Sequence, residues 1–187
     1  MVPTLETSLR TGNSRVFTKL DLQSAFWQVP VLPRDREKTA FSFDGRVYVW
    51  RVMPFGLMNA PATFQSIMDT HFADISGKFL RIYIDDLLVF SDHFIEHLEH
   101  LDRTLGRLEQ VGLKASLEKT LWAVCRVPYL GYILTPGRVE MDPDKVRDAL
   151  KIPTPDRVIN INNAKPQSLR KLVRIFLGLT GFYRVFI

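Results

Sequence analysis

Residues 79–91 read FLRIYIDDLLVFS, two apolar runs joined by an acidic pair. The runs at 79–84 and 87–90 are rich in aromatic and β-branched side chains, and only Asp85 and Asp86 separate them. This pattern predicts a tight antiparallel hairpin with both carboxylates at its tip. Two carboxylates on a rigid, buried hairpin repel each other, so the arrangement favours a bound cation.

On both sides of this hairpin, strand and helix patterns alternate and predict a mixed α and β chain. A strand is expected at 16–20, ending at Asp21, and strand pairs are expected in 41–53 and 129–141, around the turns Asp44-Gly45 and Pro136-Gly137. Helices are expected after Asn59, after a cap at Ser91 or Asp92 as far as Gly112, from Pro143 to about Lys151, and after a cap at Ser168.

The two central helices should each bury an apolar face. The expected core residues are Phe64, Ile67, Met68 and Phe72 in the first helix and Ile95, Leu98, Leu101, Leu105 and Leu108 in the second. Both faces follow from apolar residues at helical spacing.

The composition agrees with a folded domain. The 187 residues are 46% hydrophobic and 24% charged, close to globular averages. The single cysteine, Cys125, forms no disulfide within the chain, which disfavours a secreted, disulfide-stabilised protein. The apolar run 175–187 carries Arg184 and falls short of the roughly 20 residues that span a bilayer. We therefore expect no membrane partner.

Positive charge is concentrated towards the C-terminal end. The net charge is +5, and residues 151–187 hold seven basic side chains and one acidic side chain. A basic end suits a polyanion such as nucleic acid, but lysines and arginines on a solvated helix face are the more common explanation. Charge alone therefore does not decide between them.

A third carboxylate, Asp21, ends a predicted strand well before the hairpin. Mg²⁺ is usually bound by one or two protein carboxylates together with substrate phosphates, and two such ions can hold the attacking and leaving oxygens in phosphoryl transfer. The alternative is structural, with the acidic pair as a simple turn and Asp21 as a helix cap. The apolar strands that frame the pair favour the cation site.

Four runs of sequence together resemble the ordered motifs of reverse transcriptases. They are FTKLDLQSAFWQV at 17–29, MPFGLMNAPATFQ at 53–65, IYIDDLLVFS at 82–91 and YLGYIL at 129–134. The second run, together with FLGLTGFYRVFI at 176–187, resembles the Ty3/gypsy class of long-terminal-repeat retrotransposons more than the orthoretroviruses. The resemblance extends over nearly the whole chain from Val16 onward.

The resemblance implies an α+β fold, namely a right-hand polymerase palm with an antiparallel sheet and packed helices, partial fingers, and the beginning of a thumb or connection. In such a palm the aspartates of two motifs converge, and by motif position these are Asp21, Asp85 and Asp86. The resemblance implies that Asp21 and Asp85 are the principal ligands of two Mg²⁺ ions, with Mn²⁺ as an alternative, and that Asp86 assists.

Four further positions match the nucleotide-binding part of the family. Phe26 matches the aromatic steric gate that excludes a ribose 2′-hydroxyl, although an aromatic residue here could also belong to the core. Phe55 and Gly56 match the segment that covers the incoming nucleotide, with phenylalanine where retroviral enzymes carry glutamine. Lys119 matches a lysine near the triphosphate that is proposed to donate a proton to pyrophosphate, and a solvated surface lysine is an equal alternative.

Two other motifs imply contacts with the primer-template duplex. Tyr83 matches the residue beside the catalytic pair that contacts the minor groove, or it packs within its strand. Leu130, Gly131 and Tyr132 resemble the primer grip, in which a close backbone approach explains the glycine. The expected partners are therefore an RNA or DNA template with its primer, and deoxynucleoside triphosphates.

The resemblance also predicts how the chain is divided. We expect partial fingers and palm in 1–151, a linker rich in proline and asparagine in 152–167, and a terminal helix at 168–187 that begins the thumb or connection. Only 20 residues precede Asp21, so further fingers, thumb, RNase H and integrase parts are expected from a longer Pol polyprotein. The expected location is cytoplasmic, including virus-like particles, with the nucleus as an alternative.

The expected function is that of an RNA-directed DNA polymerase, a nucleotidyltransferase that adds deoxynucleotides to a primer 3′-end by two-metal phosphoryl transfer. The alternative is an inactive or domesticated retrotransposon-derived fragment that binds nucleic acid or acts as a scaffold. The three aspartates favour the enzyme, whereas the short sequence before Asp21 favours the alternative. We expect the 187 residues alone to bind primer-template weakly and to extend it poorly.

Overall fold

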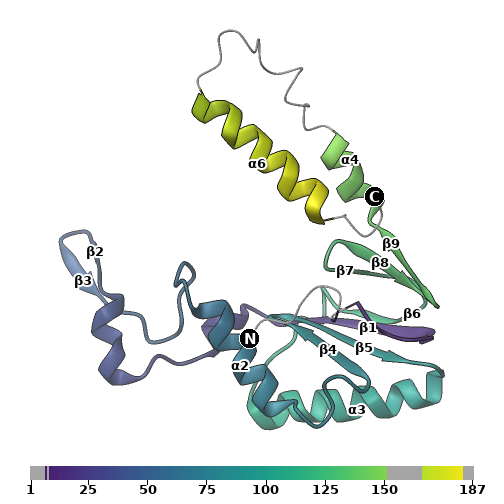
Figure 1. Ribbon diagram of the computed structural model, residues 1–187. Coiled ribbons are helices and arrows are strands. Elements are labelled where there is room, and N and C mark those ends of the chain that lie inside the picture. The colour runs from purple at the N-terminus through teal and green to yellow at the C-terminus, as the bar shows by residue number, and fades with distance from the viewer. Residues whose placement is uncertain (1–6, 8, 151–165, 183–187) are drawn as a thin grey trace. The chain divides into compact units, whose positions relative to one another are not determined.

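The computed structural model describes residues 7, 9–150 and 166–182 (Figure 1). Its chain forms two compact units, which we describe separately. The first unit comprises residues 1–129 and 134–138, and the second comprises residues 130–133 and 139–187. Helices and antiparallel strands follow one another along the chain, which confirms the predicted α+β class.

A four-stranded antiparallel sheet forms the centre of the first unit. In spatial order its strands are β4 (Leu80–Tyr83), β5 (Asp86–Ser91), β1 (Val16–Asp21) and β6 (Leu121–Val124). The predicted strand at 16–20 and the predicted hairpin are both present, and they pair with each other through β1 and β5. Strand β6 has no counterpart among the expected elements.

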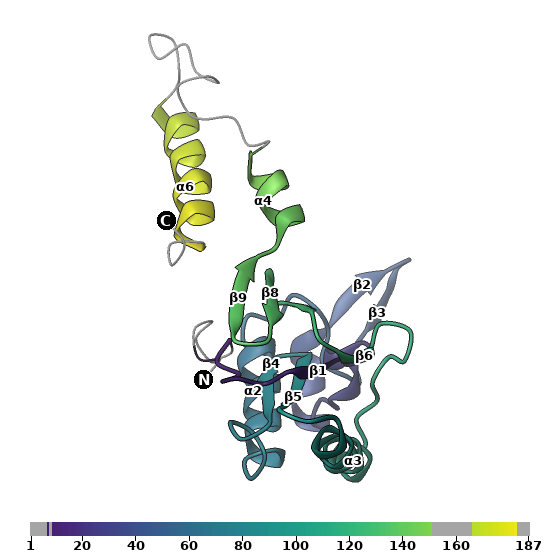
Figure 2. The same cartoon turned by 90° about the vertical axis from the view of Figure 1, so that its right-hand side faces the viewer.

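Two helices, α2 (Ala60–His71) and α3 (Phe94–Val111), lie on the same face of this sheet (Figures 1 and 2). Pro61 stands in the first turn of α2, where its missing N–H costs nothing. Helix α3 ends at Gly112, whose φ of 76° is the left-handed conformation that glycine adopts most easily. The expected cap at Ser91 or Asp92 is wrong, because the N-cap residue is His93 and its side chain forms no capping hydrogen bond.

The buried face of α2 is largely the predicted one, and that of α3 is not. Phe64, Met68 and Phe72 are fully buried, whereas Ile67 is half-buried. In α3 the buried residues are His97, Leu101, Thr104 and Leu108. Ile95, Leu98 and Leu105 of the predicted stripe are exposed, with Ile95 at 70%. The buried face of α3 is therefore rotated about the helix axis relative to the predicted apolar stripe. A criterion based on apolar residues alone missed it, because His97 and Thr104 are polar and lie on the buried face.

Hydrogen bonds to side chains of two strands explain the burial of His97. Its Nε2 lies 2.7 Å from Thr18 Oγ1 on β1, and its Nδ1 lies 2.8 Å from Ser91 Oγ on β5. Thr18 Oγ1 also accepts a hydrogen bond from the backbone N–H of Ala123 on β6. Burial, and then the positive charge of His100, lower the pKa of His97. The neutral imidazole therefore joins α3 to β1 and β5, and Thr18 extends the network to β6.

We expect acid to weaken this junction. An unfolded histidine takes up a proton near its ordinary pKa of about 6.5, whereas the lowered pKa keeps His97 neutral in the fold. Its contribution to stability is therefore present above about pH 6.5 and is lost as the pH falls. Denaturant unfolding at pH 7 and pH 5 should show a smaller loss of stability for His97→Gln than for wild type. His93→Gln, at an exposed position, should behave like wild type, and equal losses in all three would contradict this account.

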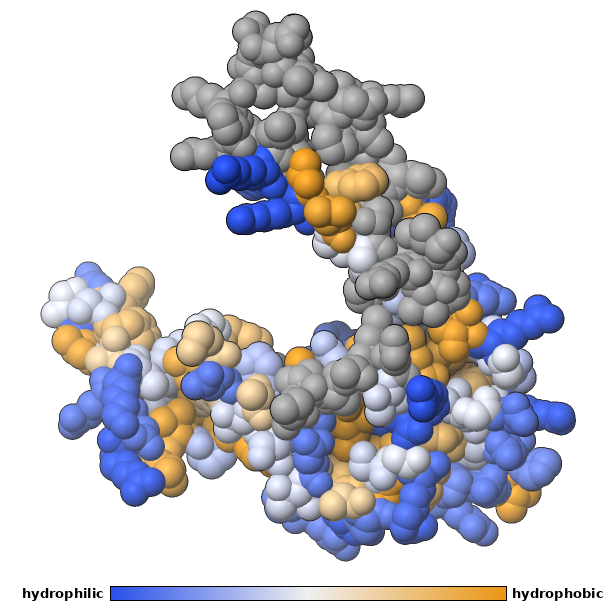
Figure 3. All heavy atoms as spheres, in the orientation of Figure 1, coloured by the Kyte–Doolittle hydropathy of each residue, from blue (hydrophilic) through white to orange (hydrophobic). Residues whose placement is uncertain are grey.

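An aromatic hairpin extends from the first unit and comprises β2 (Phe41–Phe43) and β3 (Arg46–Tyr48). Asp44 and Gly45 form its turn with φ values of 50° and 69°, as the predicted Asp-Gly turn requires. The pairing stops at Tyr48, so the predicted strand pair is shorter than 41–53. Apolar side chains lie exposed on this hairpin (Figure 3), and they include Phe41, Phe43, Val47 and Tyr48. Two 3-10 helices precede the hairpin, η1 (Ala25–Gln28) and η2 (Pro33–Thr39).

The remaining elements are a small sheet and two helices. The sheet has the order β7 (Val127–Tyr129), β8 (Tyr132–Thr135) and β9 (Arg138–Met141), and the predicted Pro136-Gly137 turn joins its last two strands. Helix α4 (Pro143–Leu150) begins as predicted, since Asp142 Oδ1 accepts a hydrogen bond from the N–H of Asp144. No helix in the described part of the chain is long and apolar enough to cross a bilayer.

The last helix, α6 (Pro166–Phe182), starts two residues before the predicted cap at Ser168. Proline is compatible with the first turn of a helix, and this explains the earlier start. Residues 151–165, which hold most of the predicted linker, lie outside the described residues. The predicted division at 151 and 167 therefore stays a prediction.

Candidate metal and nucleotide site

The three predicted carboxylates lie at one end of the central sheet. Asp21 is the last residue of β1 and pairs directly with Asp86, the first residue of β5. The N–H of Leu22 donates to the carbonyl of Asp85, 3.1 Å away, so Asp21 and Asp86 form the non-hydrogen-bonded kind of pair. Opposed Cβ atoms in such pairs lie about 4.5–5.5 Å apart. The register thus brings together residues that are distant in sequence.

The tip of the hairpin differs from the prediction by one residue. Tyr83 pairs with Asp86, so the two-residue turn consists of Ile84 and Asp85, and Asp86 belongs to the strand. The two aspartates therefore have different backbone environments. Ile84 has a φ of 56°, which is strained for a β-branched side chain.

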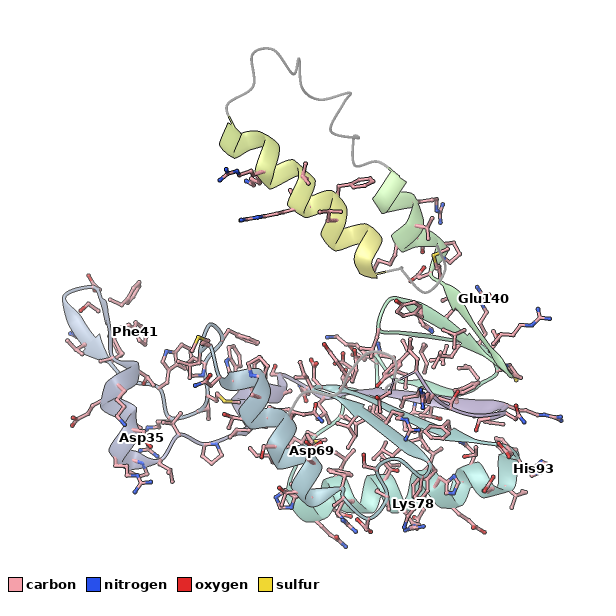
Figure 4. All side chains as sticks on the ribbon, viewed as in Figure 1. Asp35, Phe41, Asp69, Lys78, His93 and Glu140 are labelled. Carbon is pink, nitrogen blue, oxygen red and sulfur yellow. The ribbon has the colours of Figure 1, made fainter. Side chains whose placement is uncertain are left out.

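Gln65, a buried residue of α2, holds this strained turn. Its Oε1 accepts a hydrogen bond of 2.8 Å from the backbone N–H of Ile84. Its Nε2 donates to Asp69 Oδ1, also at 2.8 Å, and lies 3.5 Å from the carbonyl of Ile82. Figure 4 marks Asp69 on α2. Helix α2 thus fixes the backbone beside Asp85.

We expect Gln65→Leu to destabilise the protein by about 1–3 kcal/mol, because the replacement leaves the N–H of Ile84 without its acceptor. The free energy of unfolding measured with denaturant checks this. Gln110→Leu, at an exposed position of α3, is the matched control and should change stability by no more than about 0.5 kcal/mol. Equal stability of the two variants would contradict the role assigned to Gln65.

The electrostatics of Asp85 reflect its crowded position. Burial raises the pKa of its carboxyl, and the negative charges of Asp86 and Asp21 raise it further. A hydrogen bond from the Asp85 backbone and the positive charge of Lys19 act in the opposite direction. A cation placed among these groups would favour the ionised carboxylate.

Two lysines pair with the other aspartates. Lys19 Nζ lies 2.9 Å from Asp86 Oδ1, and both side chains are more than three-quarters buried. Lys119 Nζ lies 3.6 Å from Asp21 Oδ1, but the lysine is 70% exposed. The structure therefore places the predicted Lys119 beside the carboxylates. Lys19 was not among the predicted site residues.

The donor chemistry of this site fits Mg²⁺, which prefers carboxylate oxygens. Burial first, and then the charges of Asp86 and Asp21, raise the pKa of Asp85, and a bound cation would offset both effects. Within the described residues no group of three or more His, Cys, Asp or Glu side chains is gathered in the arrangement of a metal site. Asp21 and Asp86 are instead paired with lysines, so these pairs would have to adjust around a cation.

The predicted nucleotide residues Phe26 and Phe55 contact each other. Phe26 lies in η1, and its ring packs edge-on against Phe55 and Phe64, with centroids 5.7 and 5.8 Å away. Phe26 is half-buried at the edge of the core, whereas Phe55 is 64% exposed. Gly56 has a φ of 89° and open space where a side chain would begin. Both the steric-gate role and the core role of Phe26 are compatible with this packing.

The predicted primer-template residues fall into two groups. Tyr83 lies directly opposite Asp86 in the first unit. Leu130 and Gly131 form the turn between β7 and β8, with φ values of 52° and 81°, and Tyr132 begins β8. The glycine is thus explained by its left-handed backbone. These last three residues belong to the second unit.

Two residues that act on the carboxylate site, Lys19 and Gln65, were not predicted from the sequence. Strand alternation could have found Lys19, since it stands two residues before Asp21 and so shares its face. Gln65 sits next to the core residue Phe64 at a helical position, and its sequence carries no comparable signal. Its partners lie on a different element, and only the fold reveals them.

Comparison with known proteins identifies the class. Residues 2–134 match the family model described as reverse transcriptase (RNA-dependent DNA polymerase), and the chain belongs to this family. It is 38% identical to the Pol polyprotein of the transposon gypsy from Drosophila melanogaster, over 94% of this chain and 16% of that protein. It is also 38% identical to the Pol polyprotein of the Drosophila transposon opus, over the whole chain and 17% of that protein.

These relatives confirm the resemblance to the Ty3/gypsy-type retrotransposons. The chain spans about a sixth of the length of these curated relatives.

Solved structures confirm the polymerase fold. The foamy viral protease-reverse transcriptase in complex with an RNA/DNA hybrid superimposes with a TM-score of 0.79 at 23% identity, over 98% of this chain and 23% of that one. A second structure of the foamy viral enzyme, with double-stranded DNA, gives a TM-score of 0.82 over 98% of this chain and 30% of that one. The sheet of β1, β4, β5 and β6 with its two helices is therefore the palm of an α+β polymerase.

Proposed function

We propose that this chain is the palm of an RNA-directed DNA polymerase that adds deoxynucleotides to a primer 3′-end. The observation that carries the proposal is the convergence of Asp21, Asp85 and Asp86 at one end of the central sheet. Membership of the reverse transcriptase family supports it. We further propose that the reaction is a two-metal phosphoryl transfer, for which this carboxylate set is suited.

In this proposal Asp21 and Asp85 would hold two Mg²⁺ ions. The ions would supply charge neutralisation on the triphosphate and an activated primer hydroxyl. The chain itself would do the positioning. The β1–β5 pairing fixes the spacing of the carboxylates, and Gln65 fixes the turn that carries Asp85.

Residues around the carboxylates would select and orient the nucleotide. Phe26, supported by two aromatic rings, would form the surface beneath the sugar and exclude a 2′-hydroxyl by contact. Phe55, whose ring contacts that of Phe26, and Gly56 would cover the incoming nucleotide. Lys119, beside Asp21, would lie close to the triphosphate charge and donate a proton to pyrophosphate.

The nucleic acid would be held by Tyr83 at the carboxylates and by Leu130, Gly131 and Tyr132 at the primer strand. The solved relatives were captured with an RNA/DNA hybrid and with double-stranded DNA, which supports primer-template as the partner. The curated relatives are Pol polyproteins, so we propose that this chain acts within a longer Pol chain. Its proposed location is the cytoplasm, including virus-like particles, where such a chain would copy its RNA.

Primer extension on an RNA template tests the proposal. The chain is expressed within its longer Pol sequence and supplied with a DNA primer, the four deoxynucleotides and Mg²⁺. We expect template-directed DNA synthesis that ceases when EDTA removes the metal. The 187 residues alone should bind primer-template weakly and extend it poorly. If the longer chain binds primer-template but never extends it, the function is that of an inactive nucleic-acid-binding fragment.

A further inference from the structure

The two aspartates of the β4–β5 hairpin have different partners. We propose that Lys19 is a positioning residue that holds the Asp86 carboxylate, so that Asp85 and Asp21 are left to bind the cation. This inference rests on the proposed function, because it assigns unequal roles within the same carboxylate site. It adds a second basic side chain, besides Lys119, to the carboxylate site.

The strand register brings Lys19 to Asp86. Side chains alternate along a strand, so Lys19 and Asp21 lie on one face of β1. Thr18 on the other face bonds to His97 of α3, so Lys19 and Asp21 point away from the helices. Asp86 lies opposite Asp21 and is therefore the diagonal neighbour of Lys19. The 2.9 Å contact between Lys19 Nζ and Asp86 Oδ1 follows from this geometry.

The burial of the pair makes it stronger than an ordinary surface contact. The side chains of Lys19 and Asp86 are 22% and 24% exposed. The neighbouring pair of Lys119 and Asp21 is longer, and its lysine is mostly in solvent. Charges that are partly removed from water attract each other more strongly, and an unpaired buried lysine would be costly. We therefore expect the ion pair between Lys19 and Asp86 to persist.

Asp85 differs from Asp86 in this respect. No ion pair joins its carboxylate to a lysine or arginine in the described part of the chain. It stands in the turn, one residue from Asp86 and on the backbone that Gln65 holds. A cation that arrives at this end of the sheet would find the Asp85 carboxylate available and Asp86 already neutralised. Lys19 thus makes the adjacent side chains of Asp85 and Asp86 chemically unequal, because among the described residues it forms an ion pair with Asp86 alone.

Removing Lys19 should change metal binding in a characteristic direction. Without the ammonium group, Asp86 can turn to the cation as an additional ligand, so the affinity should rise. Damage to the fold would lower the affinity instead. A purely long-range effect of the lysine charge would raise the affinity equally with and without the Asp86→Asn substitution. A double-mutant cycle separates these cases.

The test is Mn²⁺ binding to the purified 187-residue chain, followed by the electron paramagnetic resonance signal of free Mn²⁺. Lys19→Met, Asp86→Asn and the double variant form the cycle. Lys19→Arg keeps the charge, and Lys78→Met removes one charge from an exposed position in the loop between α2 and β4 (Figure 4). Asp85→Asn reports on the site itself. Lys19→Gln, which stays polar, replaces Lys19→Met in the cycle if the latter unfolds.

We expect Lys19→Met to tighten Mn²⁺ binding about 10-fold when Asp86 is present and by less than about 3-fold when it is combined with Asp86→Asn. Lys19→Arg and Lys78→Met should stay within about 2-fold of wild type. Weaker binding by Lys19→Met, or the same change with and without Asp86→Asn, would overturn the inference alone. If wild type binds no Mn²⁺, or if Asp85→Asn binds it equally well, the proposed metal site fails and the inference fails with it.

Discussion

Replacing Asp85 by asparagine in the longer Pol chain is expected to reduce RNA-templated DNA synthesis by about 1,000-fold or more. Asparagine keeps the size of the side chain but removes the charge that would hold the cation. Loss of a metal contact costs several kcal/mol of transition-state stabilisation, and each 1.36 kcal/mol is a factor of ten in rate. Single-nucleotide incorporation, measured under single-turnover conditions, gives this rate directly.

Two further variants calibrate that result. Asp86→Asn should lower the rate less than Asp85→Asn, because Asp86 is already paired with Lys19. Asp102→Asn, which alters an exposed aspartate of α3, should leave the rate within about 2-fold of wild type. Equal losses for Asp85→Asn and Asp102→Asn would remove Asp85 from the chemistry.

Replacing Phe26 by valine is expected to reduce the preference for deoxynucleotides over ribonucleotides by about 10–100-fold, the range for filling or opening an apolar pocket. The ring is held edge-on by Phe55 and Phe64, so its position is fixed, and shortening it opens the space beneath the sugar. The measurement is the ratio of kcat/KM for dNTP and rNTP with the same primer-template.

Phe26→Val also removes packing at the edge of the core, so stability is measured in parallel. Phe43→Val, on the exposed hairpin, is the matched aromatic control and should leave the ratio unchanged. If Phe26→Val lowers both kcat/KM values equally, Phe26 is a core residue and not a steric gate.

The elements that the sequence predicts well are those with strong local signals. The Asp44-Gly45 turn, the hairpin at 79–91 and the end of α3 at Gly112 depend on residues that favour one backbone conformation. Motif position also predicted Asp21, Asp85 and Asp86 at one site, and the β1–β5 register brings their backbones together. Their roles stay predictions until activity is measured.

The features that the sequence failed to predict depend on contacts between distant elements. Strand β6 is short, carries a weak strand pattern and is recognisable only beside β1. The buried face of α3 includes His97 because Thr18 and Ser91 offer it hydrogen bonds from the sheet. In the same way, Gln65 is a site residue because it bonds to Ile84. Each case is a polar side chain or edge strand whose partner is remote in sequence.

The most direct test of the central claim is the position of a bound metal. Crystals of the chain grown with Mn²⁺ allow the ion to be located by its anomalous scattering. Our account predicts a peak between Asp21 and Asp85, with carboxylate oxygens at roughly 2 Å and Lys19 still bound to Asp86. Mn²⁺ bound at other carboxylates, with none at the end of β1, would contradict the account.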